Sequence, residues 1–262
     1  MAKQPIVLIH GTWATGNLWR EVPETLEALG FEVHTPTLRH HDHDFDTVRR
    51  TVSTASLTDY VDDLVAYCRT LPVPPLLLGH SLGGLLAQLV ASRPETEIAG
   101  LILASPAPSA GMFNMYPSMT RMFFVHHLHP LFWRRPVMPD RKMFGWGVMN
   151  EQDPGVRDEI FEQLVPESGR AYFQLVFWYL DPSQAARVDD RQITMPTLVI
   201  NGTKDRIVVP RVSRLTAARF ERATHREVEG ADHSLLWGRF HRPTFGVIEE
   251  WLGENSLLPV AA

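Results

Sequence analysis

Residues 76–86 have the sequence LLLGHSLGGLL, in which the pattern Gly-x-Ser-x-Gly runs from Gly79 to Gly83. On its own this pattern is a weak signal, because glycine and serine are both common residues. Its surroundings make it specific, since an apolar strand comes directly before it and an apolar helix over residues 82–92 comes directly after it. The stretch therefore predicts a strand, a tight turn at Ser81 and a helix.

A serine on such a turn is placed for nucleophilic chemistry. The turn imposes strained backbone angles on Ser81 and holds its hydroxyl clear of the sheet. Gly79 and Gly83 lack a Cβ atom, so the strand and the helix can pack closely around it. The N–H of Leu82 lies at the helix N-terminus, where the helix dipole favours an anion. We predict Ser81 as a nucleophile and Leu82 as an oxyanion donor. The alternative, a serine that only caps the helix, is disfavoured by the flanks.

The rest of the chain alternates short apolar runs with helical patterns. Strands are expected at residues 4–9, 31–35, 74–78, 99–104, 195–201 and 223–228. Helices are expected at residues 18–29, 57–71, 82–92, 209–220 and 240–253, whereas the polar residues 36–56 are expected to form a loop. Strands and helices that alternate in this way predict an α/β fold, with a mostly parallel sheet of about six strands covered by helices on both faces.

One long segment interrupts this alternation after the fourth expected strand. Residues 107–187 hold 14 of the 25 aromatic residues and seven of the nine methionines. We expect residues 1–106 and 188–262 to form one core domain, and 107–187 to form a helical cap. The aromatic and methionine side chains suit either a small core of the cap itself or a lid whose apolar underside lines a substrate site. Met112 is one residue expected to contact substrate.

Two other strand ends carry residues that could activate a serine. A serine hydroxyl needs a base, and the base needs a carboxylate that orients it. His233, in the sequence GADHS, follows the strand at 223–228, and Asp205 follows the strand at 195–201. The order Ser81, Asp205, His233 is the one expected when the nucleophile lies on a strand–turn–helix. The alternative acids are Asp232, Asp189 and Asp190.

The loop after the first strand should provide a second oxyanion donor. It reads His10-Gly11-Thr12-Trp13, and Gly11 permits a tight turn there. We expect the N–H of Thr12 to be the donor, with the N–H of Trp13 as the alternative. Trp13 and His80 are also expected to line the substrate pocket.

Four segments together resemble the α/β-hydrolase superfamily: His10-Gly11-Thr12-Trp13, residues 79–84, residues 201–210 with Asp205, and Gly230-Ala231-Asp232-His233. The resemblance implies a cap after the fourth strand. The family usually begins with two antiparallel strands, and because nine residues before His10 leave no room for them, a shortened sheet is expected. A serine nucleophile disfavours epoxide hydrolases and haloalkane dehalogenases, which use aspartate, and dienelactone hydrolases, which use cysteine.

The reaction implied by this resemblance is acyl transfer. We expect a carboxylesterase for a small hydrophobic or aromatic ester, with no cofactor. Thioesterases, lactonases and C–C bond hydrolases use the same residues and remain alternatives. A C–C bond hydrolase would need cations near its substrate, and Arg121, Arg134 and Arg135 are candidates. A ligand-binding receptor built on a hydrolase fold is the alternative outside enzymes.

Composition excludes several other classes. The 262 residues have a net charge of −5, so binding to nucleic acid is not expected. Cys68 is the single cysteine, which rules out an intramolecular disulfide and a cysteine-based zinc site. The histidines at 40–43 and 126–129 are expected in solvated segments rather than on a metal. No apolar run is long enough to span a membrane, and residues 1–9 do not resemble a secretion signal, so a cytoplasmic protein is expected. The oligomeric state is not predicted.

Overall fold

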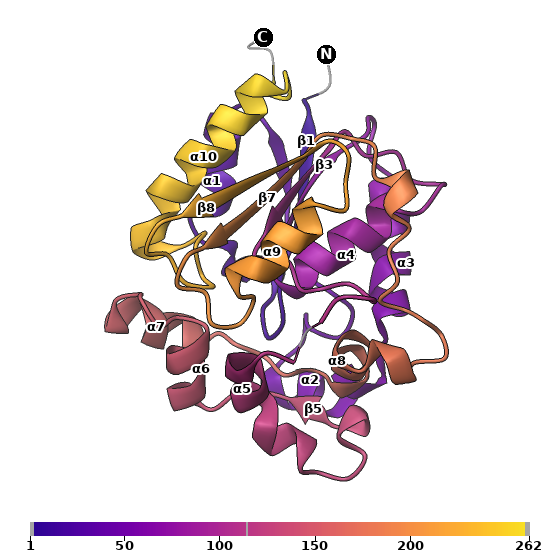
Figure 1. The fold of residues 1–262 in the computed structure, drawn as a ribbon, viewed down its shortest axis with the longest axis vertical. Coiled ribbons are helices and arrows are strands. Elements are labelled where there is room, and N and C mark those ends of the chain that lie inside the picture. The colour runs from indigo at the N-terminus through magenta and orange to yellow at the C-terminus, as the bar shows by residue number, and fades with distance from the viewer. Residues whose placement is uncertain (1–2, 114, 260–262) are drawn as a thin grey trace.

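The computed structural model describes residues 3–113 and 115–259. Within these residues six strands form one sheet in the order β2-β1-β3-β4-β7-β8, and all neighbouring strands are parallel (Figure 1). The strands are β1 (Pro5–Ile9), β2 (Glu32–His34), β3 (Leu76–His80), β4 (Gly100–Ala104), β7 (Thr197–Gly202) and β8 (Ala223–Val228). The expected mostly parallel sheet of about six strands is confirmed.

The four central strands are buried along their whole length. Their sequences are nearly continuous apolar runs, as is typical of parallel strands covered on both faces. Strand β3 continues two residues beyond Leu78, where the sequence suggested an end. It does so because Gly79 still pairs with Ile9 of β1 and with Leu103 of β4. This extension brings the strand directly up to Ser81.

Helices flank the sheet, and they are α1 (Val22–Ala28), α3 (Leu57–Cys68), α4 (Leu82–Ala91), α9 (Pro210–Ala217) and α10 (His241–Glu254), with the short 3-10 turns η1 (Gly16–Trp19) and η6 (Gly238–Phe240). The apolar helix α4 is buried on all sides and packs on β3 and β4. The helix expected at 18–29 is divided, because Arg20 has a φ of 52° and separates η1 from α1.

The segment 36–56 is only partly the loop that its polar composition suggests. It contains α2 (Phe45–Thr51) and η2 (Val52–Thr54). The Asp44 carboxylate accepts a hydrogen bond from the Thr47 N–H at 3.1 Å, which caps the helix. Val48 and Val52 lie four residues apart and are both buried. A capped helix with one buried edge therefore forms within a polar stretch.

The chain between β4 and β7 forms its own group of elements. These are α5 (Pro117–His127), η3 (Phe132–Arg134), β5 (Pro136–Val137), α6 (Arg141–Gly147), α7 (Pro154–Phe161), β6 (Glu167–Ser168), α8 (Gly169–Val176), η4 (Trp178–Leu180) and η5 (Asp190–Gln192). Strands β5 and β6 pair as a small antiparallel ribbon. In Figure 1 helices α5–α8 gather at the end of the sheet opposite to both chain termini.

The two ends of this inserted segment lie side by side. The N–H of Ala110 donates to the carbonyl of Ala186 at 2.8 Å. The segment therefore leaves the core and returns to it at one place. Among the residues described, no helix combines the length and the apolar character needed to cross a membrane.

Candidate active site

Ser81 occupies the turn between β3 and α4 in a strained conformation. Its φ of 55° and ψ of −118° lie in a region that residues with side chains rarely adopt. The backbone around it is fixed on both sides, because the Ser81 N–H donates to Ala104 O at 3.0 Å and its carbonyl accepts from Ala107 N at 2.8 Å. The fold thus maintains the turn that presents this hydroxyl.

Glycine is required at two places around the turn. A Cβ atom on Gly79 would lie 2.2 Å from the carbonyl oxygen of Gly83, and one on Gly83 would lie 1.9 Å from that of Ile9. Both distances are far below van der Waals contact and involve backbone atoms that cannot move aside. The close packing expected at these glycines is present.

The His233 ring is held by Asp205. The Nδ1–H of His233 donates to Asp205 Oδ2 at 2.8 Å. The other oxygen of that carboxylate accepts from the N–H groups of Ile207 and Val208 at 2.8 and 2.9 Å. Asp205 follows β7 and His233 follows β8, so neighbouring strand ends bring the two side chains together. This geometry fixes the ring and leaves Nε2 free to act as a base.

The other acids considered from the sequence point elsewhere. Asp232 accepts from the Ser234 hydroxyl at 2.7 Å and from the Glu151 N–H at 2.7 Å, and burial raises the pKa of its carboxyl group. The Asp189 carboxylate binds Arg191, and the Asp190 carboxylate binds Arg219. These three carboxylates therefore have partners other than the His233 ring.

Three backbone N–H groups near Ser81 are available to an anion. Within the described part of the chain, the N–H groups of Thr12, Trp13 and Leu82 donate to no acceptor of the protein. The loop that carries Thr12 lies against the serine, since a Cβ on Gly11 would be 3.0 Å from Ser81 Cβ. Unpaired donors from two separate elements thus meet at the serine turn, as an oxyanion site requires.

His80 supports the arrangement as a neutral ring. Its Nε2–H donates to the carbonyl of His233 at 2.8 Å, and its ring packs against the His233 ring and edge-on against Trp237. Burial, reinforced by the nearby His233, lowers the pKa of His80 to about 3. His80 therefore stays uncharged at ordinary pH and helps to hold the backbone of His233.

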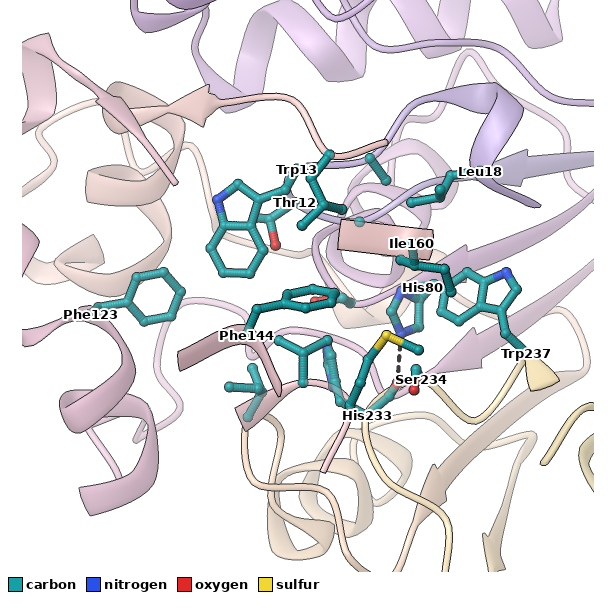
Figure 2. A pocket seen from close by; sticks show the side chains of 17 residues that line it. Thr12, Trp13, Leu18, His80, Phe123, Phe144, Ile160, His233, Ser234 and Trp237 are labelled. Atoms are coloured by element: carbon teal, nitrogen blue, oxygen red, sulfur yellow. Dashed lines mark hydrogen bonds between the residues drawn. The ribbon is translucent and has the colours of Figure 1, made fainter. Parts of the chain in front are cut away.

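An apolar cavity opens over these residues, with an empty volume of about 550 Å³, part of it open to solvent. Figure 2 shows the rings of Trp13, Phe144 and Trp237 around His80 and His233. The lining residues are Gly11, Thr12, Trp13, Ala14, Leu18, His80, Ser81, Phe123, Phe144, Val148, Met149, Ile160, Leu164, Ile207, His233, Ser234 and Trp237. Within the residues described, the Ser81 hydroxyl forms no hydrogen bond, so it is free to approach an incoming group.

Much of this lining was not identified from the sequence. Trp13 and His80 line the cavity as expected, and so does Thr12, which we predicted only as an oxyanion donor, but Met112 is not among the lining residues. The Met112 sulfur instead accepts from Ser109 and Thr216, on the side of α9. The methionine of the cavity is Met149, just after α6. A methionine-rich segment signals an apolar surface, but spacing alone does not say which methionine faces inward.

The histidines at 40–43 and 126–129 were expected in solvated segments, but several of them are buried or half-buried. His41 is buried beside Glu167, His40 is half-buried and His43 is exposed. Throughout residues 3–113 and 115–259, no three His, Cys, Asp or Glu side chains gather as a metal site would require. Cys68 is buried in α3, and burial raises the pKa of its thiol to about 11, which keeps it protonated.

The comparison with known proteins agrees with this fold. Residues 6–245 match the alpha/beta hydrolase family. The chain belongs to that family.

Several relatives are similar over different lengths. A pyrethroid hydrolase of Sphingobium wenxiniae is 34% identical over 102 residues, which are 39% of this chain and 35% of that protein. The chain thus matches about a third of the length of this relative. A pimeloyl-[acyl-carrier protein] methyl ester esterase of Nitrosospira multiformis is 26% identical over 82% of both chains. The crystal structure of a monoacylglycerol lipase of Paleococcus ferrophilus superposes with a TM-score of 0.68 at 22% identity, covering 97% of this chain and 98% of that one. At this identity the last likeness shows the fold alone.

Proposed function

We propose that this protein is a carboxylesterase that cleaves small, neutral, hydrophobic esters, with Ser81, His233 and Asp205 as its catalytic triad. One observation carries the proposal. The strained serine, the oriented histidine and unpaired N–H donors converge on a single apolar cavity. Relatives whose names specify hydrolysis of an ester support the reaction type.

The first half of the reaction forms an acyl-enzyme. His233 Nε2 takes the hydroxyl proton as Ser81 Oγ attacks the ester carbonyl carbon. The resulting oxyanion accepts hydrogen bonds from the N–H of Leu82 and from that of Thr12 or Trp13. Losing one such donor typically costs about 3 kcal/mol of transition-state stabilisation. The protonated His233 then donates its proton to the leaving alkoxide, and the C–O bond breaks.

The second half releases the acid. A water molecule takes the place of the alcohol, and His233 removes its proton as the water oxygen attacks the acyl carbon. The tetrahedral intermediate uses the same N–H donors. When it collapses, the C–O bond to Ser81 breaks and His233 returns the proton to Ser81 Oγ. Asp205 remains ionised and stabilises the imidazolium in both halves.

The cavity lining supports a neutral, apolar substrate. Its residues include no Lys, Arg, Asp or Glu side chain. An anionic acyl group would therefore lose its water without gaining a counter-ion. A C–C bond hydrolase for a dienol acid is disfavoured for this reason, because Arg121, Arg134 and Arg135 are not among the lining residues. We propose that residues 107–187 act as the cap of this site, since Phe123, Phe144 and Ile160 cover it.

The test is a panel of p-nitrophenyl esters of increasing acyl length, assayed with the wild-type protein and Ser81→Ala. We expect the Ser81→Ala variant to lose kcat by a factor on the order of 10⁶. A fluorophosphonate should label Ser81 in the wild-type protein only. Ser213→Ala is the matched control, because Ser213 is buried in α9 and its hydroxyl has no partner among the described residues. Undiminished turnover by purified Ser81→Ala would refute the proposal.

A further inference from the structure

Trp13, in the loop beside Ser81, is held by the inserted segment at three points. Its carbonyl accepts from the N–H of Val165 at 2.8 Å. Its indole Nε1–H donates to the carbonyl of Val137 at 3.0 Å. Its ring stacks on Phe123 of α5, with the ring centres 5.6 Å apart. Segments separated from Trp13 by more than a hundred residues therefore fix both its backbone and its side chain.

These contacts hold Trp13 in an unfavourable conformation. Its φ is 67°, in the left-handed region that bulky side chains avoid. A residue stays there only when its surroundings leave no alternative. The conformation matters because the φ of Trp13 sets the direction of its own N–H relative to the carbonyl that Val165 holds, and this N–H is one of the unpaired donors near Ser81. If Trp13 relaxed, this donor would turn.

A buried carboxylate anchors the ribbon that makes one of these contacts, the hydrogen bond between Trp13 and Val137. Glu167 in β6 pairs with Val137 in β5, so it lies in the same ribbon. Its side chain is fully buried, accepts from the Tyr60 hydroxyl at 2.8 Å and lies 3.4 Å from His41 Nε2. Tyr60 and His41 belong to the core. The ribbon is thus tied to the core by a buried polar cluster that the reaction does not use.

The same cluster reaches the loop from its other end. The His41 ring packs edge-on against the His10 ring, with centres 5.5 Å apart. His10 Nε2 accepts from the Leu38 N–H at 3.0 Å, so its Nδ1 carries the proton and donates to Gly11 O at 3.0 Å. His10, Gly11 and Trp13 all lie in one four-residue stretch of the loop. Both ends of residues 10–13, which we call the oxyanion loop, are therefore held.

We propose that Trp13 and Glu167 are positioning residues through which the β5–β6 ribbon sets the oxyanion loop. This inference rests on the proposed function and extends it. The inserted segment does more than cover the substrate, because its ribbon determines whether the second oxyanion donor points at the reacting carbonyl. Disturbing the ribbon should then lower kcat while leaving KM nearly unchanged, since the ground-state ester does not need the donor as strongly.

The first test removes one hydrogen bond and keeps the ring. Trp13→Phe should lower kcat at least tenfold and change KM less than twofold. Its affinity for an alkyl boronic acid, whose tetrahedral boronate anion on Ser81 places a hydroxyl oxygen where the oxyanion would lie, should fall by the same factor as kcat/KM. The matched control is Trp251→Phe, because the Trp251 indole N–H in α10 has no partner in the described structure. Trp13→Phe with kcat within twofold of wild type would overturn the role of Trp13.

The second test needs no catalytic activity. Amide hydrogen exchange of residues 10–14 should be at least tenfold faster in Glu167→Gln, and Tyr60→Phe should show a smaller change in the same direction. Glu162→Gln, an exposed acid of the same inserted segment, should leave this exchange unchanged. Tyr60→Phe removes only a hydroxyl and preserves the test if Glu167→Gln does not fold. Unchanged exchange in the folded variants would overturn the anchor.

The two readouts separate this inference from the proposed function. A wild-type protein that cleaves no ester would refute the function, and the exchange experiment would still decide whether the ribbon holds the loop. An active wild type with a fully active Trp13→Phe variant would refute the inference and leave the function intact.

Discussion

Asp205, and not Asp232, is the acid that contacts His233, with Oδ2 of Asp205 2.8 Å from Nδ1 of the histidine ring. Asp232 is adjacent to His233 in the chain but turns its carboxylate toward Ser234 and Glu151. The acid 28 residues away is thus the spatial neighbour, because both it and the histidine follow neighbouring parallel strands.

This relationship predicts unequal effects of two similar substitutions. Asp205→Asn should lower kcat by a factor on the order of 10⁴, because an amide favours the wrong tautomer of the ring. Asp232→Asn should lower kcat far less, because Asp232 does not touch the ring. Steady-state kinetics on one ester, with circular dichroism to confirm folding, will distinguish them. A larger loss in Asp232→Asn would show that the acid is misassigned.

Substituting glycine by alanine should have opposite effects at two positions. Gly83→Ala places a methyl group 1.9 Å from Ile9 O and should cost more than about 4 kcal/mol of unfolding free energy. Gly246→Ala in α10 has no atom within 4 Å of the new methyl group and should stabilise the protein by up to about 1 kcal/mol. Denaturant unfolding measures both values, and similar values for the two variants would contradict this prediction.

The buried pair of His41 and Glu167 predicts a pH-dependent stability. Burial by itself lowers the pKa of His41, but the Glu167 carboxylate outweighs it and raises that pKa above 6.5. Burial likewise opposes ionisation of Glu167, yet His41 brings its pKa below 4.5. A histidine whose pKa is raised by folding stabilises the folded state at low pH, and this stabilisation is lost as the pH rises through the pKa of the folded state. A glutamate whose pKa is lowered by folding stabilises the folded state at high pH, and this stabilisation is lost as the pH falls through the pKa of the folded state. The pair should therefore stabilise most between pH 4.5 and 6.5.

The measurement compares unfolding free energies of the wild type and the double variant His41→Gln/Glu167→Gln across pH. Tyr60 and His10 also face the pair, and both remain in the two proteins. Burial and the nearby His41 lower the pKa of His10 to about 4, so it is mostly neutral in this range. The single variant Glu167→Gln should cost about 3–5 kcal/mol, because it leaves His41 without its counter-ion. A pH-independent difference would show that the pair is not ionic.

The apolar cavity predicts selectivity against charge. The p-nitrophenyl ester of pentanoate and the mono-p-nitrophenyl ester of succinate have similar size, but only the succinate carries a carboxylate. We expect kcat/KM for the succinate ester to be at least about 10²-fold lower than for the pentanoate ester, since burying an unpaired charge costs several kcal/mol. Comparable values for the two esters would place a cation near the acyl group.

Residues at strand ends could be predicted from the sequence because local patterns define them. Ser81 and Asp205 each follow a short apolar strand, His233 follows the more polar strand β8, and a parallel sheet brings such ends to one edge. The ends of the strands are harder to predict than their centres, as β3 shows. Glycine usually interrupts a strand, but Gly79 continues one because backbone pairing on both sides does not need a side chain.

The contacts of the inserted segment could not be predicted in the same way. Met112 and Met149 have similar local surroundings in the sequence, yet only Met149 faces the cavity. The hydrogen bonds that Trp13 forms with Val137 and Val165 use only the backbone of the two valines, so the side chains at those positions carry no sign of them. Glu167 looks like an ordinary surface acid until the fold buries it against His41 and Tyr60.

The hydrogen bond between Ala110 and Ala186 shows that the inserted segment begins and ends at one place on the core, so it could be replaced as a unit. A loop whose ends already meet can change length cheaply, since doubling it costs only about 0.6 kcal/mol of closure entropy. A foreign segment grafted between these two alanines would bring a new substrate chamber while the sheet and its strand ends stayed as they are. A graft would also have to keep the three contacts that hold Trp13, which are the carbonyl of Val137, the N–H of Val165 and the ring of Phe123. Replacing this one continuous segment could then change both the substrate range and the turnover number of related proteins.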